Sequence, residues 1–384
     1  MDDVKRFFKP SKQSYFLFGP RGTGKTYWLQ EEYPEALYLN LLEWDLYRRF
    51  LARPEELISV VESSLNKTQI FIIDEVQKVP ELLDCVHLLL NKYRDIQFIL
   101  TGSSVRKLKA KGVNLLGGRA VLKKMHPYLA AELKDRFDLE KAVRLGMLPL
   151  VWEAKDPALT LETYIQYYIK EEVHAEGLVR NLSDFARFTE IICLSQGSPL
   201  NMSNIATECQ ISLAATKGYI SILEDMLLAH LLPVFTKRAK RALVKHPKFY
   251  YFDCGVYHSL RPKGFLDSPS EVSGFALETL VAQHLRAWID YSKGNFKLFY
   301  WQTHTKIEVD FVLYGETGLY AFEIKNTQNP TASMLHGLKA FKEDYPIAKT
   351  YLLHRGNQRL KIGDVLCLPI DQFLRELMPD NIPD

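Results

Sequence analysis

An eight-residue stretch near the N-terminus has the residue types of a phosphate-binding loop. It reads GPRGTGKT and fits the pattern G-x-x-x-x-G-K-[ST]. Glycines let backbone N–H groups converge on phosphate oxygens, and the start of a following helix favours an anion. We expect Lys25 to reach the β- and γ-phosphates and the Thr26 hydroxyl to bind Mg²⁺; the alternative is a Gly-rich turn without a ligand. The predicted nucleotide-binding residues are Gly19, Pro20, Arg21, Gly22, Thr23, Gly24, Lys25 and Thr26.

Polar residues with matching chemistry follow two apolar runs farther along the chain. In QIFIIDE, Asp74 would hold Mg²⁺ through water, and Glu75 would orient and polarise the attacking water. In ILTGSS, Ser103 or Ser104 would contact the γ-phosphate. The alternatives are a solvated strand end for the carboxylates and a helix N-cap for the serines. Together with Lys25, these residues predict an ATP hydrolase with ATP and Mg²⁺ as cofactors.

A second group of charged residues lies in the last third of the chain. Asp310 in IEVDFVLY, with Glu323 and Lys325 in LYAFEIKN, has the spacing of the PD-(D/E)xK nuclease signature, and Glu278 in FALETL supplies a third acid. The acids could bind a divalent metal, Mg²⁺ or Mn²⁺, while the lysine positions water. Val309 departs from the signature, in which proline precedes the aspartate. The alternative is a structural Glu–Lys ion pair on buried strands, so DNA cleavage stays uncertain.

Basic residues cluster in two stretches, one of which follows a predicted helix-turn-helix. The segment 203–226 suits two short helices, with Ser212, Thr216 and Lys217 facing outward on the second helix. The basic stretch after it resembles the wing of a winged helix and could contact DNA phosphates or serve as a packing element. Its basic residues are Lys237, Arg238, Lys240, Arg241, Lys245 and Lys248. The other stretch, a solvated face or a polyanion contact, contains Arg106, Lys107, Lys109, Lys111, Arg119, Lys123 and Lys124.

The elements that must position these residues follow from hydrophobic periodicity. Near-continuous apolar runs alternate with amphipathic helical patterns in the N-terminal part, which predicts a parallel α/β sheet. The middle is mostly helical, and the last part returns to strands with a leading helix, which predicts a second α/β domain. The expected strands of the first sheet lie at 14–18, 36–40, 69–75 and 96–104. The tail MPDNIPD is expected to fray.

The motifs taken together resemble the AAA+ ATPases of a widespread prokaryotic group that carries a C-terminal domain of unknown function. That group reads I-D-E-x-Q, T-G-S-S and L-x-G-R-A where this chain has FIIDEVQ, ILTGSS and NLLGGRA. The resemblance extends through YISILEDMLL, KFYYFDCGV, FALETLVAQHL, EVDFVL and AFEIK. It implies a homo-oligomer, with a hexameric ring as one arrangement, in which Arg119 could act as an arginine finger on a neighbour's nucleotide. The alternative is that Arg119 pairs locally with an acid.

We therefore expect an α/β multidomain protein. Its parts are a P-loop AAA+ ATPase domain at 1–130, a helical and winged-helix domain at 131–245, and a restriction-endonuclease-like α/β domain of PD-(D/E)xK type at 246–384. The expected function is ATP-driven action on DNA, with the winged helix and the C-terminal domain binding or cutting it. The alternative is a nucleotide-dependent switch in defence or signalling whose C-terminal domain binds a protein partner.

Composition limits the class of protein further. The net charge of +3 creates no strong global field, so any polyanion site must come from local clustering. The five cysteines include no CxxC pair, which argues against structural zinc and suits a reducing cytosol. No apolar run is long enough to span a membrane, and the start MDDVKRFFKP lacks a signal-peptide core. We expect a cytoplasmic location without membrane contact.

Overall fold

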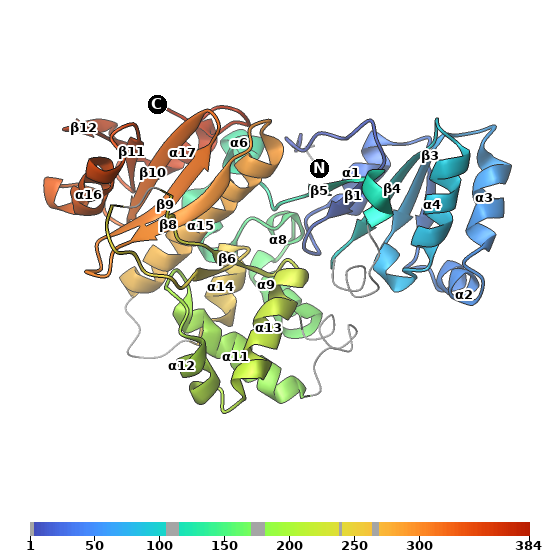
Figure 1. The fold of residues 1–384 in the computed structure, drawn as a ribbon, viewed down its shortest axis with the longest axis horizontal. Helices are drawn as coiled ribbons and strands as arrows, with labels where there is room; N and C mark the ends of the chain where they lie inside the picture. Colours follow the sequence, from blue (N-terminus) through green and yellow to red (C-terminus); the bar gives the residue numbers. More distant parts are fainter. Residues whose placement is uncertain (1–3, 105–114, 170–180, 238–239, 263–268) are drawn as a thin grey trace. The chain divides into compact units, whose positions relative to one another are not determined.

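The structure is a computed structural model that describes residues 4–104, 115–169, 181–237, 240–262 and 269–384 (Figure 1). The chain forms two compact units. The smaller unit contains residues 8–126 and 225–227, and the larger unit contains 1–7, 127–224 and 228–384. The first boundary lies near the predicted one at 130, whereas the predicted middle and C-terminal domains share the larger unit.

The smaller unit is built around a parallel sheet of five strands in the order β2-β3-β4-β1-β5. The strands are β1 (Tyr15–Phe18), β2 (Leu37–Asn40), β3 (Ile70–Asp74), β4 (Gln97–Gly102) and β5 (Val121–Lys124). The helices are α1 (Lys25–Glu32), α2 (Trp44–Ala52), α3 (Glu56–Ser64) and α4 (Leu82–Lys92). Side chains of β1, β3 and β4 are buried because helices cover the sheet. The chain reverses direction across the sheet between β1 and β4, and in such folds ligands bind at the carboxyl ends of the strands at that point.

The first part of the larger unit is mainly helical, as the sequence predicts. Its helices are α6 (Ala130–Leu133), α7 (Leu139–Leu145), α8 (Pro149–Trp152), α9 (Pro157–Thr163), α11 (Leu182–Ile192), α12 (Met202–Glu208), α13 (Leu213–Asp225) and α14 (Cys254–Leu260). Strands β6 (Ala229–Leu232) and β7 (Lys248–Tyr251) form an antiparallel pair after α13. The buried Asp253 caps α14 by accepting hydrogen bonds from the amides of Gly255 and Val256, and it also accepts one from Met147.

The rest of the larger unit is a mixed sheet of six strands in the order β12-β13-β11-β10-β9-β8. The strands are β8 (Lys297–Gln302), β9 (Glu308–Gly315), β10 (Gly318–Lys325), β11 (Lys349–His354), β12 (Leu360–Ile362) and β13 (Val365–Pro369). The helices are α15 (Pro269–Tyr291), α16 (His336–Asp344) and α17 (Ile370–Glu376). Ala321 of β10 packs in one core with Leu338 and Phe341 of α16, whereas Phe322 contacts Phe373 of α17. Alternation along the strand thus directs neighbouring residues to opposite faces.

Two sequence expectations are wrong in detail. Strand β5 lies inside the stretch for which the sequence predicts only a basic run. Its apolar Val-Leu pair is too short to show a strand pattern. The tail does not fray: the Trp288 indole donates to the carbonyl oxygens of Met378 and Asn381, and the Tyr351 hydroxyl donates to Asp384. Among the described residues, no helix has both the length and the apolar character needed to cross a bilayer.

Candidate functional site

The Gly-rich loop joins β1 to α1 at the carboxyl end of the parallel sheet. Gly22 and Gly24 have φ of +82° and +86°, a conformation that a side chain would strain. Lys25 is the first residue of α1 and is buried, and its ammonium donates to the carbonyl oxygens of Gly19 at 2.7 Å and Pro20 at 3.2 Å. The loop therefore curls around a positive charge.

Asp74 ends β3 and meets the start of α1. The Thr26 hydroxyl donates to Asp74 Oδ2 at 2.9 Å, so the two residues predicted to hold Mg²⁺ are brought together. The hydroxyls of Tyr38 and Thr101 also donate to this carboxylate. Burial, followed by the charge of Asp74, raises the pKa of Tyr38, which stays a neutral donor. Sequence reasoning missed Tyr38 and Thr101, although both lie on strands next to β3.

Glu75, Gln77 and Ser103 form a polar group beside Asp74. Glu75 has φ of +60°, which turns the chain sharply at the end of β3. The Gln77 amide donates to the Glu75 carboxylate and, at 3.3 Å, to the Ser103 hydroxyl, which lies 3.5 Å from the same carboxylate. Gln77 is buried, and its Oε1 has no hydrogen-bond partner among the described residues. Gln77 is the glutamine of the I-D-E-x-Q motif, to which the sequence assigned no role.

Arg119 lies on the surface of the smaller unit. Its guanidinium is 3.2 Å from His87 Nε2 on α4. It is exposed, as a residue that reaches another subunit must be, but its role in trans stays a prediction. Most of the preceding basic stretch, from Arg106 to Lys111, lies outside the described residues.

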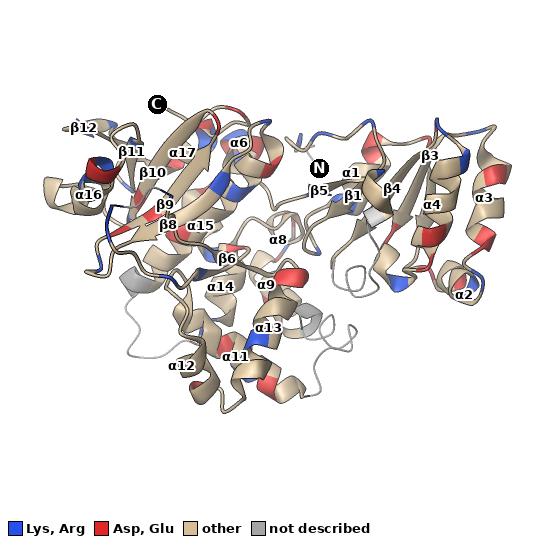
Figure 2. Ribbon diagram, in the orientation of Figure 1, with Lys and Arg blue, Asp and Glu red and all other residues tan. Residues whose placement is uncertain are grey.

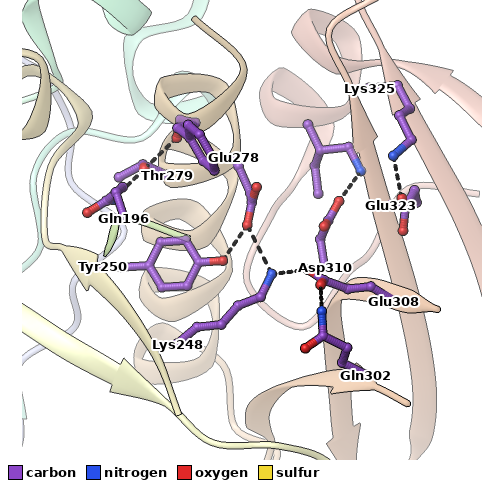
Figure 3. A network of polar contacts seen from close by, with 12 residues as sticks. Gln196, Lys248, Tyr250, Glu278, Thr279, Gln302, Glu308, Asp310, Glu323 and Lys325 are labelled. Atoms are coloured by element: carbon purple, nitrogen blue, oxygen red, sulfur yellow. Dashed lines mark hydrogen bonds and ion pairs between the residues drawn. The ribbon is translucent and has the colours of Figure 1, made fainter. Parts of the chain in front are cut away.

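In the larger unit, the predicted C-terminal residues lie together in a carboxylate–lysine cluster (Figure 3). Glu278 comes from α15, Asp310 from β9, and Glu323 and Lys325 from β10. The structure adds three residues that the sequence analysis did not assign to this cluster: Lys248 and Tyr250 of β7, and Glu308 of β9. Glu308 precedes Asp310 by two positions on the same strand, a spacing that could have signalled it. Below, "the cluster" means these seven residues.

One side of the cluster is organised by Lys248. Its ammonium is 3.6 Å from Glu278 Oε1 and forms an ion pair with Glu308. The Tyr250 hydroxyl donates to Glu278, and the Gln302 amide donates to Glu308. Only 1% of Lys248 is exposed, so its charge is balanced by these carboxylates rather than by water.

The other side of the cluster contains the predicted metal ligands. Asp310 Oδ2 accepts a hydrogen bond of 2.7 Å from the Ile324 amide, and Lys325 Nζ is 2.5 Å from Glu323 Oε1. Glu323 is buried, and its Oε2 has no hydrogen-bond partner among the described residues. Within the described part of the chain, no three His, Cys, Asp or Glu residues are arranged to hold a metal ion.

Four carboxylates and two ammonium groups make the cluster acidic. Burial, with a further contribution from Asp310, raises the pKa of Glu278 to about 7 and the pKa of Glu323 well above its ordinary value. Burial also raises the pKa of Glu308. The pKa of Lys325 is raised because Glu323 and Asp310 outweigh its burial. These directions indicate that positive charge only partly compensates the buried carboxylates, so a bound cation would stabilise their ionised forms.

The basic residues after the helix-turn-helix have contacts that favour the packing alternative. Lys237 Nζ lies 4.5 Å from the ring centre of Tyr314, and Arg241 pairs with Glu343 and Asp344 of α16. Lys240 donates weakly to the Glu343 carbonyl oxygen, and Arg238 lies outside the described residues. Figure 2 shows basic and acidic residues interspersed in both units.

On the second helix of the helix-turn-helix, the predicted outward face is only partly correct. Lys217 and Ser212 of this region are exposed. Thr216 is buried, because its side chain turns back and donates to the Ser212 carbonyl oxygen at 3.2 Å. Lys217 therefore remains the basic residue of this helix that is available to a ligand.

Comparisons with known proteins agree with the N-terminal site. Residues 11–134 match a family model described as AAA domain, so this part of the chain is similar to an AAA domain. Residues 136–267 match a domain of unknown function (DUF8612), and residues 273–373 match another (DUF4143). The cluster includes residues from both of these segments. Neither match describes a function for the larger unit.

Two relatives that match most of the chain are uncharacterized mycobacterial proteins. They are Rv2008c of Mycobacterium tuberculosis and Mb2031c of Mycobacterium bovis, each 24% identical over 375 residues, covering 93% of this chain and 80% of the relative. Similar solved structures include domain III of the replication initiation protein DnaA from Thermotoga maritima. That match is 19% identical, covers 44% of this chain and 80% of that chain, and has a TM-score of 0.23. The replication initiator DnaA bound to AMPPCP and single-stranded DNA matches at 16% identity, 56% of this chain and 82% of that chain, with a TM-score of 0.26. TM-scores this low carry no argument about shared fold or function.

Proposed function

We propose that the AAA-like domain binds and hydrolyses ATP with Mg²⁺, and that the larger unit applies this cycle to DNA. The observation that carries the ATPase proposal is the contact of Thr26 with Asp74 beside the loop that encloses Lys25. Residues 48 positions apart meet at the carboxyl ends of parallel strands, where phosphate ligands bind in such sheets. The hard oxygen donors of Thr26 and Asp74 suit Mg²⁺.

The residues of the loop have distinct tasks in this proposal. ATP with Mg²⁺ supplies the transferable phosphoryl group when bound. Lys25 exchanges its bonds to loop carbonyl oxygens for phosphate oxygens, and Asp74 is oriented by the hydroxyl groups that donate to it. Glu75 orients and polarises a water molecule, while Ser103, next to Glu75, reports the γ-phosphate position.

Two variants test hydrolysis. Lys25→Ala should lose nucleotide binding, because the phosphates lose their main cation. Glu75→Gln should bind ATP but hydrolyse it at least about 100-fold more slowly, because general-base catalysis contributes about 10²–10⁴-fold. Lys67→Ala, at an exposed lysine of the same unit, is the matched control and should behave as wild type. Normal turnover by Glu75→Gln would exclude Glu75 from the mechanism.

We further propose a homo-oligomer in which Arg119 acts on the nucleotide of a neighbouring subunit. The exposure of Arg119 supports this role. An arginine finger contributes about 10³–10⁵-fold to the rate. Mixing Arg119→Ala subunits with Lys25→Ala subunits should therefore restore measurable activity at mixed interfaces. Mixtures that co-assemble without recovery would show that Arg119 does not act in trans.

For the larger unit, we propose a divalent metal, Mg²⁺ or Mn²⁺, held by Asp310 and Glu323. Asp310 and Glu323 lie on the neighbouring antiparallel strands β9 and β10, which supports this proposal. The buried, unpartnered Glu323 Oε2 is the type of oxygen that a hard cation would satisfy. Lys325, next to Glu323, would orient water toward a DNA phosphodiester.

Cleavage assays with linear, forked and four-way DNA in Mn²⁺ test this activity. Asp310→Asn and Lys325→Met should abolish cleavage while leaving the ATPase rate unchanged, because the ATP site lies in the other unit. Asp364→Asn, at an exposed aspartate of the same sheet region, is the matched control. Wild-type protein that cleaves none of these DNAs, together with a strongly destabilised Lys325→Met, would leave a structural ion pair.

We propose that Lys217 contributes to DNA binding, because it is an exposed cation on the second helix of the helix-turn-helix. Lys217→Ala should lower the salt slope of DNA binding by about one unit. The control Lys155→Ala, at an exposed lysine elsewhere in the larger unit, should not.

The five cysteines are buried free thiols, which supports the proposal that the protein works in the cytoplasm.

The alternative function, a nucleotide-dependent switch that binds a protein partner, is supported by the contacts of Lys237 with Tyr314 of β9 and of Arg241 with Asp344 of α16, which favour packing over DNA contact. If added DNA changes neither the ATPase rate nor the salt dependence of that rate, the result would favour this switch.

A further inference from the structure

One buried ammonium group in the cluster has no place in the proposed chemistry. Lys248 comes from β7, outside the sheet that carries Asp310 and Glu323, and enters the cluster between Glu278 and Glu308 (Figure 3). Its side chain is 1% exposed, and the Tyr300 ring centre lies 5.3 Å from its nitrogen. A buried ammonium needs such compensation, because burial removes its water.

Glu278 and Glu308 both direct oxygens at this single nitrogen. A carboxylate from a helix and a carboxylate from a strand that converge on one point are also the ligands that a hard divalent cation would use. An ammonium group and a divalent cation therefore compete for the same two carboxylates. We propose that Lys248 is a built-in cation that excludes a divalent metal from the Glu278–Glu308 pair and restricts the cluster to one metal ion.

The two lysines of the cluster differ in the way this role requires. Lys325 has 37% of its side chain exposed and pairs with one carboxylate, Glu323, so it can move toward solvent when a metal arrives. Lys248 is enclosed, and it can leave the carboxylates only by burying an unpaired charge. A metal can therefore displace Lys325 at low cost but cannot displace Lys248.

The consequence is a one-metal site. Two-metal sites place their ions about 3.5–4 Å apart to stabilise both the attacking and the leaving oxygen. Here the position nearest to Glu278 and Glu308 already carries a positive charge that cannot polarise water as a metal does. Glu278 then acts as a partner of Lys248 and Tyr250, which differs from the third metal ligand that the sequence predicted.

The assignment of one metal to Asp310 and Glu323 rests on the proposed function, whereas the exclusion by Lys248 does not. Measurements of Mn²⁺ binding distinguish the proposed metal site from the exclusion by Lys248. We would use the full chain without nucleotide, with calorimetry and electron paramagnetic resonance at about pH 8, which is above the pKa of Glu278. Wild type should bind one ion at the cluster, Lys248→Met two, and the matched control Lys297→Met, at an exposed lysine of β8, one. The second ion in Lys248→Met should disappear when Glu278→Gln is added.

Each outcome decides a different point. Wild type without Mn²⁺ but Lys248→Met with one ion would support the inference and refute the proposed Asp310–Glu323 metal site. If Lys248→Met binds no more Mn²⁺ ions than wild type, the inference would be overturned and the proposed Asp310–Glu323 site would stay intact. If Lys248→Met does not fold, Glu278→Gln in the wild-type background decides. Mn²⁺ affinity within threefold of wild type is expected, and a loss of tenfold or more would make Glu278 a ligand and overturn the inference.

Discussion

Replacing Gln77 by Met tests whether this residue positions the proposed base. The Gln77 amide joins the Glu75 carboxylate to the Ser103 hydroxyl, so it holds both groups at the end of β3 and β4. Met has a similar length and no hydrogen-bonding amide. Because Gln77 Oε1 lacks a partner among the described residues, its removal offsets part of the cost of losing the amide hydrogen bonds, so the free energy of unfolding should fall by no more than about 3 kcal/mol.

The expected loss appears in turnover. A hydrogen bond to a charged group contributes about 1.5–3 kcal/mol. If this bond maintains the productive position of Glu75 in the transition state, its loss corresponds to a fall in kcat of about 10- to 150-fold. Lys25 is held by loop carbonyl oxygens and Thr26 by Asp74, so nucleotide affinity and KM should change little when Gln77 is replaced.

Steady-state ATP hydrolysis and fluorescent-nucleotide binding measure both quantities on the same preparation. Gln69→Met, at an exposed glutamine whose amide donates only to the Leu65 carbonyl oxygen in this structure, is the matched control and should keep the wild-type kcat. A kcat of Gln77→Met within twofold of wild type, in a background where Glu75→Gln is inactive, would refute the positioning role. An effect confined to KM would do the same.

Three further predictions concern the larger unit. Burial lowers the pKa of His284 from 6.5 to about 4, so the unfolded state binds more protons between these pH values and stability is lost as the pH falls. Urea unfolding should show up to roughly 3 kcal/mol of acid destabilisation. If the free energy of unfolding of His284→Gln falls as steeply with pH, the prediction is contradicted. Arg241→Ala leaves the buried Asp344 without its ion pair, so it should lower the melting temperature while changing DNA affinity less than twofold; a larger loss of affinity would restore the DNA-contact alternative. Gly146→Ala places a Cβ against the Asp253 carboxylate at a φ of +76°, so it should cost at least about 2 kcal/mol in chemical denaturation, and a neutral result would refute the clash.

The sequence alone was sufficient to predict the Gly-rich loop at 19–26 and most of the elements around it, although not β5. A phosphate-binding loop is a contiguous stretch whose backbone conformation depends on its own glycines, so local spacing identifies it. Apolar runs buried on both faces of a parallel sheet are equally local, and Asp74 and Ser103 follow directly from the strand ends. Asp310, Glu323 and Lys325 could be found in the same way, because they alternate along adjacent strands.

Only the tertiary structure decided which charged residues meet across the chain. Lys248 appeared in the sequence as one more basic residue of a wing, yet β7 delivers it to Glu278 and Glu308. Arg241, four residues beyond Lys237 in the same wing, pairs instead with α16. Spacing along the chain cannot predict such partners, because the energy of a charge depends on how deeply packing buries it and on which opposite charge that packing brings within reach.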